Sequence, residues 1–194
     1  MTRWPPASYA HDLSHGNLAQ SGGPVDIVPW DSTIISYAVD SDGAPIDRDT
    51  FRAEVRAALD EWTRVTEQKR QFYEVEDPFT AQFLFAFRTR DHRENCDKGF
   101  TNESNTIAHA FTSDSKCLAG VVHLNAGLEW HADGSNRFGT YDVRSAILHE
   151  TGHLIGLGHY ETPGHIMFHE YVGVVRRLTD AEGADALEVI KEAS

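Results

Sequence analysis

Residues 149 to 159 read HETGHLIGLGH, which places three histidines and a glutamate in a fixed order. If the stretch begins on a helix, His149 and His153 stand at i and i+4, and both imidazoles leave the same face one turn apart. Two such imidazoles can reach one tetrahedral metal ion at about 2.0 to 2.1 Å. Gly156 can adopt the positive φ that a reversal of the chain needs, which brings His159 to the same ion. The pattern predicts a zinc site with these three histidines as ligands.

Glu150 follows the first histidine, so its carboxylate points slightly round the helix from the histidine pair. It can lie beside a water at the metal without being a ligand itself. Three neutral imidazoles leave a fourth zinc position open, which is typical of catalytic sites, and zinc lowers the pKa of a water there to about 7. Glu150 is therefore the predicted general base. Gly152 costs about 1 kcal/mol relative to alanine inside a helix, so we expect close packing beneath the site.

The elements that must position these residues follow from hydrophobic periodicity. Segments rich in β-branched and aromatic residues predict strands at 33–39, 82–87, 106–111 and 120–124. Apolar residues at helical spacing predict helices at 49–68 and 142–154, and a last helix that begins at the capping box of Thr179 and Glu182. Strands that mostly precede helices indicate an α+β architecture.

The bulk composition limits the kinds of function. A chain of 194 residues fits one domain, which we place at 25–194 after an N-terminal extension at 1–24. The net charge of −13 argues against nucleic acid as a partner, and no apolar run approaches the ~20 residues of a membrane span. A monomer is the default expectation. Cys96 and Cys117 are too few for a disulfide framework, and whether they form one bridge is left open.

The motif HExxHxxGxxH, followed by Met167, resembles the signature of the metzincin metallopeptidases. Within that clan the chain is similar to the matrixin catalytic domain, through VPW at 28–30, AHAF at 108–111 and LTD at 178–180. The resemblance implies the zincin fold of metzincins, with a twisted, mainly parallel sheet, an antiparallel edge strand and about three helices. It also implies that Met167 forms a floor under the zinc.

The same resemblance implies how a substrate would bind. Ala108 and Ala110 would lie on the edge strand, where an extended peptide pairs through its main chain. Tyr171 and His169 would help to wall the pocket for the P1′ side chain. The expected function is that of a secreted, zinc-dependent metalloendopeptidase that prefers an apolar P1′ residue. The alternative is a catalytically silent zinc-binding module that captures an extended peptide.

Three departures from the matrixin pattern stand out. Tyr160 follows the third zinc histidine, where matrixins usually have serine. His169 stands where proline is usual after the methionine. His109 and His123 match two ligands of the matrixin structural zinc, but the first ligand pair is not reproduced, and a second zinc would need a substitute such as His92.

The calcium-binding loop of matrixins is also poorly matched. The loop reads FTNESN at 100–105, and Asn125 stands where an acidic cluster is expected. Hard cations need several oxygen ligands, preferably carboxylates. We therefore expect the calcium site to be weakened or absent, and hypothesise that a Cys96–Cys117 bridge braces the loop instead.

Overall fold

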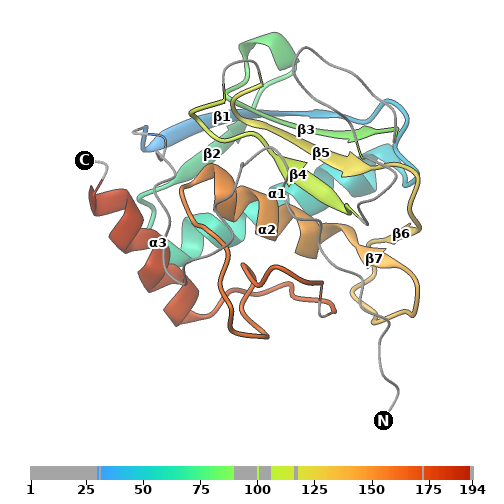
Figure 1. Cartoon of the computed structure of the whole chain (residues 1–194). Coiled ribbons are helices and arrows are strands. Elements are labelled where there is room, and N and C mark those ends of the chain that lie inside the picture. The colour runs from blue at the N-terminus through green and yellow to red at the C-terminus, as the bar shows by residue number, and fades with distance from the viewer. Residues whose placement is uncertain are drawn as a thin grey trace.

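The computed structural model describes residues 30, 32–89, 100, 106–115, 118–171 and 173–192. A five-stranded sheet forms one layer (Figure 1), with the strand order β2-β1-β3-β5-β4. The pairs β1–β2, β1–β3 and β3–β5 are parallel, and only β4–β5 is antiparallel. The strands are β1 (Ile34–Asp40), β2 (Gln71–Glu74), β3 (Phe83–Arg88), β4 (Ala108–Ala110) and β5 (Val121–Asn125). The predicted mainly parallel sheet with an antiparallel edge strand is confirmed.

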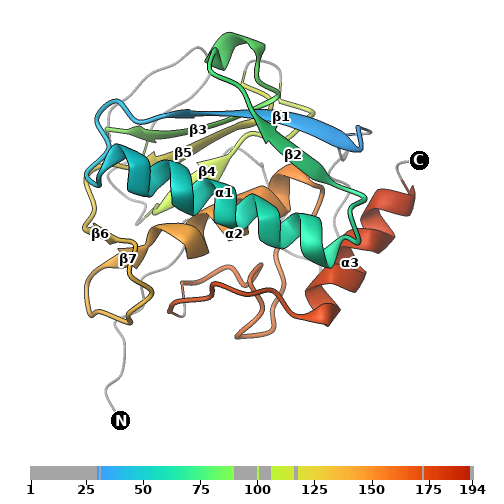
Figure 2. The same cartoon turned by 180° about the vertical axis from the view of Figure 1, so that it is seen from behind.

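Among the described residues, three α-helices complete the α+β fold, as expected. They are α1 (Arg48–Val65), α2 (Val143–Leu154) and α3 (Asp180–Glu192). Figures 1 and 2 show α1 and α2 together on one side of the sheet, with α3 at one end of α1. The buried apolar core joins the sheet to α1 and α2. Smaller elements are a 3-10 turn at Pro78–Thr80 and the paired strands β6 (Trp130–His131) and β7 (Tyr141–Asp142).

Helix α1 packs against α2 and supports it. Asp47 caps the first turn of α1 by accepting from the backbone N–H groups of Asp49 and Thr50 at 2.8 and 3.0 Å. The apolar residues of α1 recur at helical spacing and are buried. Trp62 belongs to this buried face, and its indole Nε1–H donates to the carbonyl oxygen of Leu148 in α2 at 3.0 Å. This bond fixes the depth at which the two helices pack.

Helix α2, which carries the first two histidines, is buried along almost its whole length. Asp142 is its N-cap and accepts from the backbone N–H of Ser145 at 3.0 Å. The helix ends at Leu154, and Gly156 follows with a φ of 108°. This left-handed conformation favours glycine and turns the chain back toward the site, as expected from the sequence.

The capping box at the start of α3 is confirmed. The Thr179 backbone N–H donates to Glu182 Oε2 at 2.6 Å, and the Glu182 N–H donates to Thr179 Oγ1 at 3.3 Å. Glu182 is only 2% exposed, and its other oxygen accepts from the backbone N–H of Ile166 at 2.6 Å. One carboxylate thus caps α3 and holds the loop that follows the zinc motif.

Several predicted boundaries shift, and short strands were missed. The helix predicted to reach residue 68 ends at Val65, because Glu67 and Gln68 adopt φ values of 50° and 62°. The strands β2, β6 and β7 were not predicted, and each has only two to four residues. Cys96, Cys117, His92 and the extension at 1–24 lie outside the described residues. Within the described parts of the chain, no helix is long and apolar enough to cross a membrane.

Candidate metal centre

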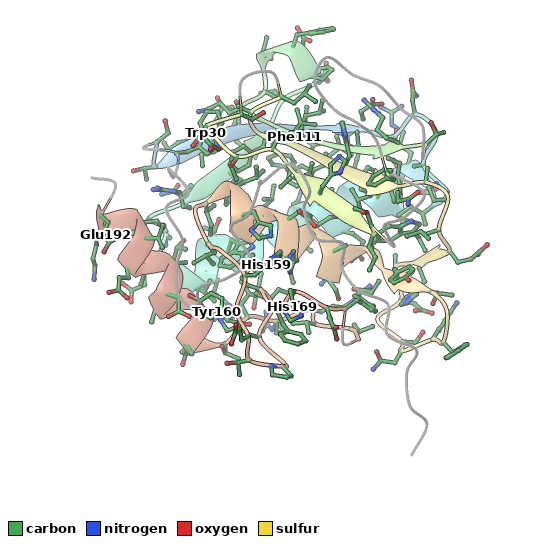
Figure 3. All side chains as sticks on the ribbon, viewed as in Figure 1. Trp30, Phe111, His159, Tyr160, His169 and Glu192 are labelled. Carbon is green, nitrogen blue, oxygen red and sulfur yellow. The ribbon has the colours of Figure 1, made fainter. Side chains whose placement is uncertain are left out.

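Three imidazoles converge in front of α2. The Nε2 atoms of His149 and His153 lie 3.2 Å apart, those of His149 and His159 3.2 Å, and those of His153 and His159 3.1 Å. Figure 3 shows His159 facing α2 from the returning segment. Tetrahedral ligands at the usual zinc–nitrogen distance are separated by about 3.3 Å. The three nitrogens therefore have the spacing of three corners of a zinc site, and they form a candidate metal cluster of the described residues.

Backbone carbonyls set the tautomers of the two helical histidines. The Nδ1 of His149 lies 2.7 Å from the carbonyl oxygen of Ile166, and the Nδ1 of His153 lies 2.8 Å from that of Leu157. A carbonyl only accepts, so each Nδ1 carries the hydrogen and each Nε2 presents its lone pair to the other histidines. Lone pairs at this separation repel one another unless they share a cation. The donor set therefore fits zinc.

Burial keeps His149 neutral. Burial lowers the pKa of His149 to about 3, with the neighbouring His159 as the next cause. A metal ligand must be unprotonated, and a depressed pKa provides that state well below neutral pH. His149 and His153 are 1% and 3% exposed, whereas His159 is partly buried.

Glu150 lies on α2 directly after the first histidine and is 3% exposed. A carboxylate at this position shares the buried side of the molecule with the histidine cluster.

Met167 and Gly152 pack against each other under the helix. Met167 is completely buried, and a Cβ built on Gly152 would lie 2.2 Å from the Met167 sulfur and 3.3 Å from Trp62. The glycine is therefore needed because the methionine occupies the place of its missing side chain. The close packing expected beneath the site from Gly152 is present.

The edge strand borders the site. Ala108 and Ala110 lie on β4, pair with Leu124 and Val122 of β5, and are 3% and 0% exposed. β4 is the terminal strand of the sheet, and Figure 1 shows it beside α2. Pairing of an extended chain with this strand stays a prediction.

The two predicted wall residues take different positions. Tyr171 is 6% exposed, and its hydroxyl accepts from the backbone N–H of Asp142 at 3.0 Å. Burial raises the pKa of Tyr171 to about 12. His169 is more open, with 39% of its side chain exposed, and its ring lies 4.5 Å from that of Phe168. Tyr171 is thus fixed to the start of α2, while His169 is only partly buried.

The pair expected for a second zinc lies apart from the three-histidine cluster. His109 Nε2 and His123 Nδ1 are 3.2 Å apart across β4 and β5, and the ring of Phe100 stacks on His109 with centroids 4.7 Å apart. Nothing is described of His92. Asn125, from the expected calcium region, donates to the carbonyl of Thr106 at 2.9 Å and accepts from the N–H of Gly127 at 3.0 Å.

Sequence reasoning missed the contacts of the loop after the motif. His165 was not singled out, although it stacks on Tyr160, and Glu182 was recognised only as a capping residue. Tyr160, which stands where matrixins usually have serine, was the one signal in the sequence for these contacts.

Family comparison agrees with this geometry. The matrixin family model matches residues 29–189, and the chain belongs to the matrixin family. It is 30% identical to Metalloendoproteinase 1-MMP of Arabidopsis thaliana over 72% of this chain and 37% of that protein. It is 29% identical to Matrix metalloproteinase-27 of Homo sapiens over 73% of this chain and 25% of that protein. The chain therefore spans well under half the length of these relatives.

Proposed function

We propose that this chain is a zinc-dependent metalloendopeptidase whose catalytic unit is residues 25–194. The observation that carries the proposal is the convergence of three imidazole Nε2 atoms, 3.1 to 3.2 Å apart, beside a helix that also carries Glu150. Membership of the matrixin family supports the same activity. His149, His153 and His159 would hold the zinc.

The protein's own residues would move the protons of the reaction. When bound, zinc would lower the pKa of a water at its open position and polarise the substrate carbonyl. Glu150 would take a proton from the attacking water as the new C–O bond forms, and would return it to the amine nitrogen as the C–N bond breaks. The carboxylate is regenerated, so the sum of the steps is hydrolysis.

We propose that the substrate is a protein segment bound in extended form. β4 is a terminal strand of the sheet, and a peptide could add to it by main-chain hydrogen bonds. Tyr171 and His169 would contribute to the wall of the P1′ pocket, which we expect to accept an apolar side chain. From its membership of the matrixin family, we further propose that this protein is secreted, and that it acts as a monomer.

Glu150→Gln provides the direct test. Removal of the general base should lower cleavage of a quenched peptide with leucine at P1′ by about 10²- to 10⁴-fold, while zinc content stays at one equivalent. Glu129→Gln is the matched control, because Glu129 is an exposed glutamate outside the site and its variant should cleave normally. Full cleavage by Glu150→Gln would remove this residue from the mechanism.

The alternative is a silent zinc-binding module that captures an extended peptide. Such a module gains nothing from a buried base beside its metal, so the 3% exposure of Glu150 favours the enzyme. A folded, zinc-loaded native protein that binds the peptide library but cleaves none of it would favour the module.

A further inference from the structure

The residue that departs from the matrixin pattern makes an unusual set of contacts. Tyr160 directly follows His159, and its ring stacks on His165 with centroids 4.1 Å apart and planes inclined by 12°. Burial, and then the charge of the nearby Asp185 of α3, raise the pKa of Tyr160.

The backbone of Tyr160 is attached to the methionine turn. The Tyr160 N–H donates to the carbonyl of Met167 at 2.9 Å, and Tyr160 forms an isolated parallel bridge with Phe168. His165, below the Tyr160 ring, belongs to the same turn, and its Nδ1 accepts from the N–H of Met167 at 3.0 Å. The proton of His165 is therefore on Nε2, which lies 3.4 Å from Asp185 Oδ2.

These contacts connect Tyr160, His165 and Met167 to one another beside the third ligand, His159. Tyr160 contacts His165 through its ring and Met167 through its backbone, and His165 in turn lies near Asp185. The same turn also orients another ligand, because the carbonyl of Ile166 accepts from His149 and its N–H donates to Glu182 of α3. The segment of His159 is thus fastened to a turn that α3 holds at two carboxylates.

We propose that Tyr160 and His165 are positioning residues that hold His159 in the zinc ligand set, with Asp185 as their anchor on α3. The inference rests on the zinc site proposed above. The ring of Tyr160 covers His165, whose Nε2 lies 3.4 Å from Asp185 Oδ2 on α3. The serine usual at this position in matrixins has no ring to stack on the histidine. Partners that orient metal-binding histidines typically change metal affinity by about 10- to 100-fold when they are removed.

Zinc release measures this role without relying on peptidase activity. Tyr160→Ser and His165→Ala are loaded with one equivalent of zinc, and the metal is withdrawn by an excess of a chromogenic chelator. We expect release about 10-fold faster or more than from the native protein. Tyr160→Phe keeps the stacked ring and loses only the hydroxyl, so its release rate should lie close to the native rate. Excess zinc should restore peptide cleavage by Tyr160→Ser.

Phe72→Ala controls for a general loss of stability. Phe72 is partly buried on β2, at the opposite edge of the sheet from β4, and packs on Phe83 with ring centroids 6.0 Å apart. Its variant should be less stable but release zinc at the native rate. Native release from Tyr160→Ser, or release no faster than from Phe72→Ala, would overturn the inference. Equal acceleration in Tyr160→Phe and Tyr160→Ser would overturn the role given to the stacked ring.

The two proposals fail separately. If the native protein binds zinc but cleaves no peptide, the proposed peptidase activity is wrong, and the zinc release rates of the variants still test the role of Tyr160. A native protein that retains no zinc rejects both.

Discussion

At the scale of single residues, the packing under the site depends on a small residue that leaves space for a large neighbour. Gly152 has no side chain because the Met167 sulfur fills that place, and Trp62 closes the same space from α1. Interiors packed to this density do not absorb an added methyl group without displacement. The floor of the site is therefore sensitive to changes of one carbon atom.

Gly152→Ala tests this packing. Alanine favours a helix over glycine by about 1 kcal/mol, but its Cβ would lie 2.2 Å from the Met167 sulfur. We expect a net loss of about 1 to 3 kcal/mol in the free energy of unfolding, measured by urea denaturation.

A double-mutant cycle supplies the control. Met167→Ala alone leaves a cavity and should cost about 2 to 5 kcal/mol, but it also makes room for the new methyl group. The double variant should be more stable than the sum of the single losses predicts. Strict additivity would show that the two side chains do not compete for the same space.

At the scale of elements, buried carboxylates join the helices to the loops that carry the site. Asp142 caps α2, is completely buried, and also accepts from Arg176 Nη2 at 2.6 Å. Glu61 of α1 is 5% exposed and accepts from Arg64, from Arg177 and from the backbone N–H of Leu178. Each acid links one helix to the segment between the methionine turn and α3.

Two variants of Asp142 separate its roles. Asp142→Asn should still cap the helix, because asparagine is as good an N-cap as aspartate, whereas Asp142→Ala removes both the cap and the partner of Arg176. We expect Asp142→Ala to lose about 3 to 5 kcal/mol of unfolding free energy and Asp142→Asn clearly less. Equal losses in chemical denaturation would show that the ion pair, and not the cap, carries the whole effect.

Glu61→Gln tests a pH-dependent contribution. Although burial alone would raise the pKa of Glu61, the hydrogen bonds from Arg64 and Leu178 and the arginine charges leave it lowered. A carboxyl group with a lowered pKa in the folded state stabilises the protein above its unfolded pKa of about 4.3, and this contribution is lost as the pH falls through the folded value.

The variant should therefore be less stable than the native protein by about 2 kcal/mol at pH 7, and the difference should shrink as the pH falls below about 4. The measurement is urea denaturation of both proteins without zinc, since zinc binding is itself pH-dependent. A difference that does not change with pH would contradict the assignment.

At the scale of the whole molecule, the sheet and two helices form one core, and the site lies where its parts meet. The edge strand β4, the buried helix α2 and the loop held by α3 come from segments far apart in the chain. The three imidazoles are held close together with their lone pairs facing, so a shared cation should stabilise the complete fold.

Removal of zinc should therefore lower the thermal midpoint of unfolding. Zinc at about 1,000 times its dissociation constant adds about 4 kcal/mol, so its addition should restore the midpoint in differential scanning calorimetry. Calcium should add nothing further if the calcium site is weakened, as the sequence indicates. Activity that returns after chelation only when calcium is added with zinc would contradict that expectation.

The local features of this protein follow from the order of its residues alone. Spacing alone indicated that His149, His153 and His159 share one metal, that Gly156 reverses the chain, and that Thr179 caps the last helix. It also predicted the bounds of helices α1 and α2 to within a few residues, because the apolar residues of a helix's buried face recur every three to four positions. Resemblance to matrixins supplied the mainly parallel sheet and its antiparallel edge.

Features that depend on contacts between distant residues became visible in the folded protein. β2 has four residues that pair with β1 across the whole of α1, so no local pattern marks it as a strand. The stack of Tyr160 on His165, the contact of His165 with Asp185 and the packing of Met167 against Gly152 join residues that no regular spacing in the sequence connects. Side-chain contacts of this kind depend on how the finished core is packed, and the spacing of residues along the chain does not encode them.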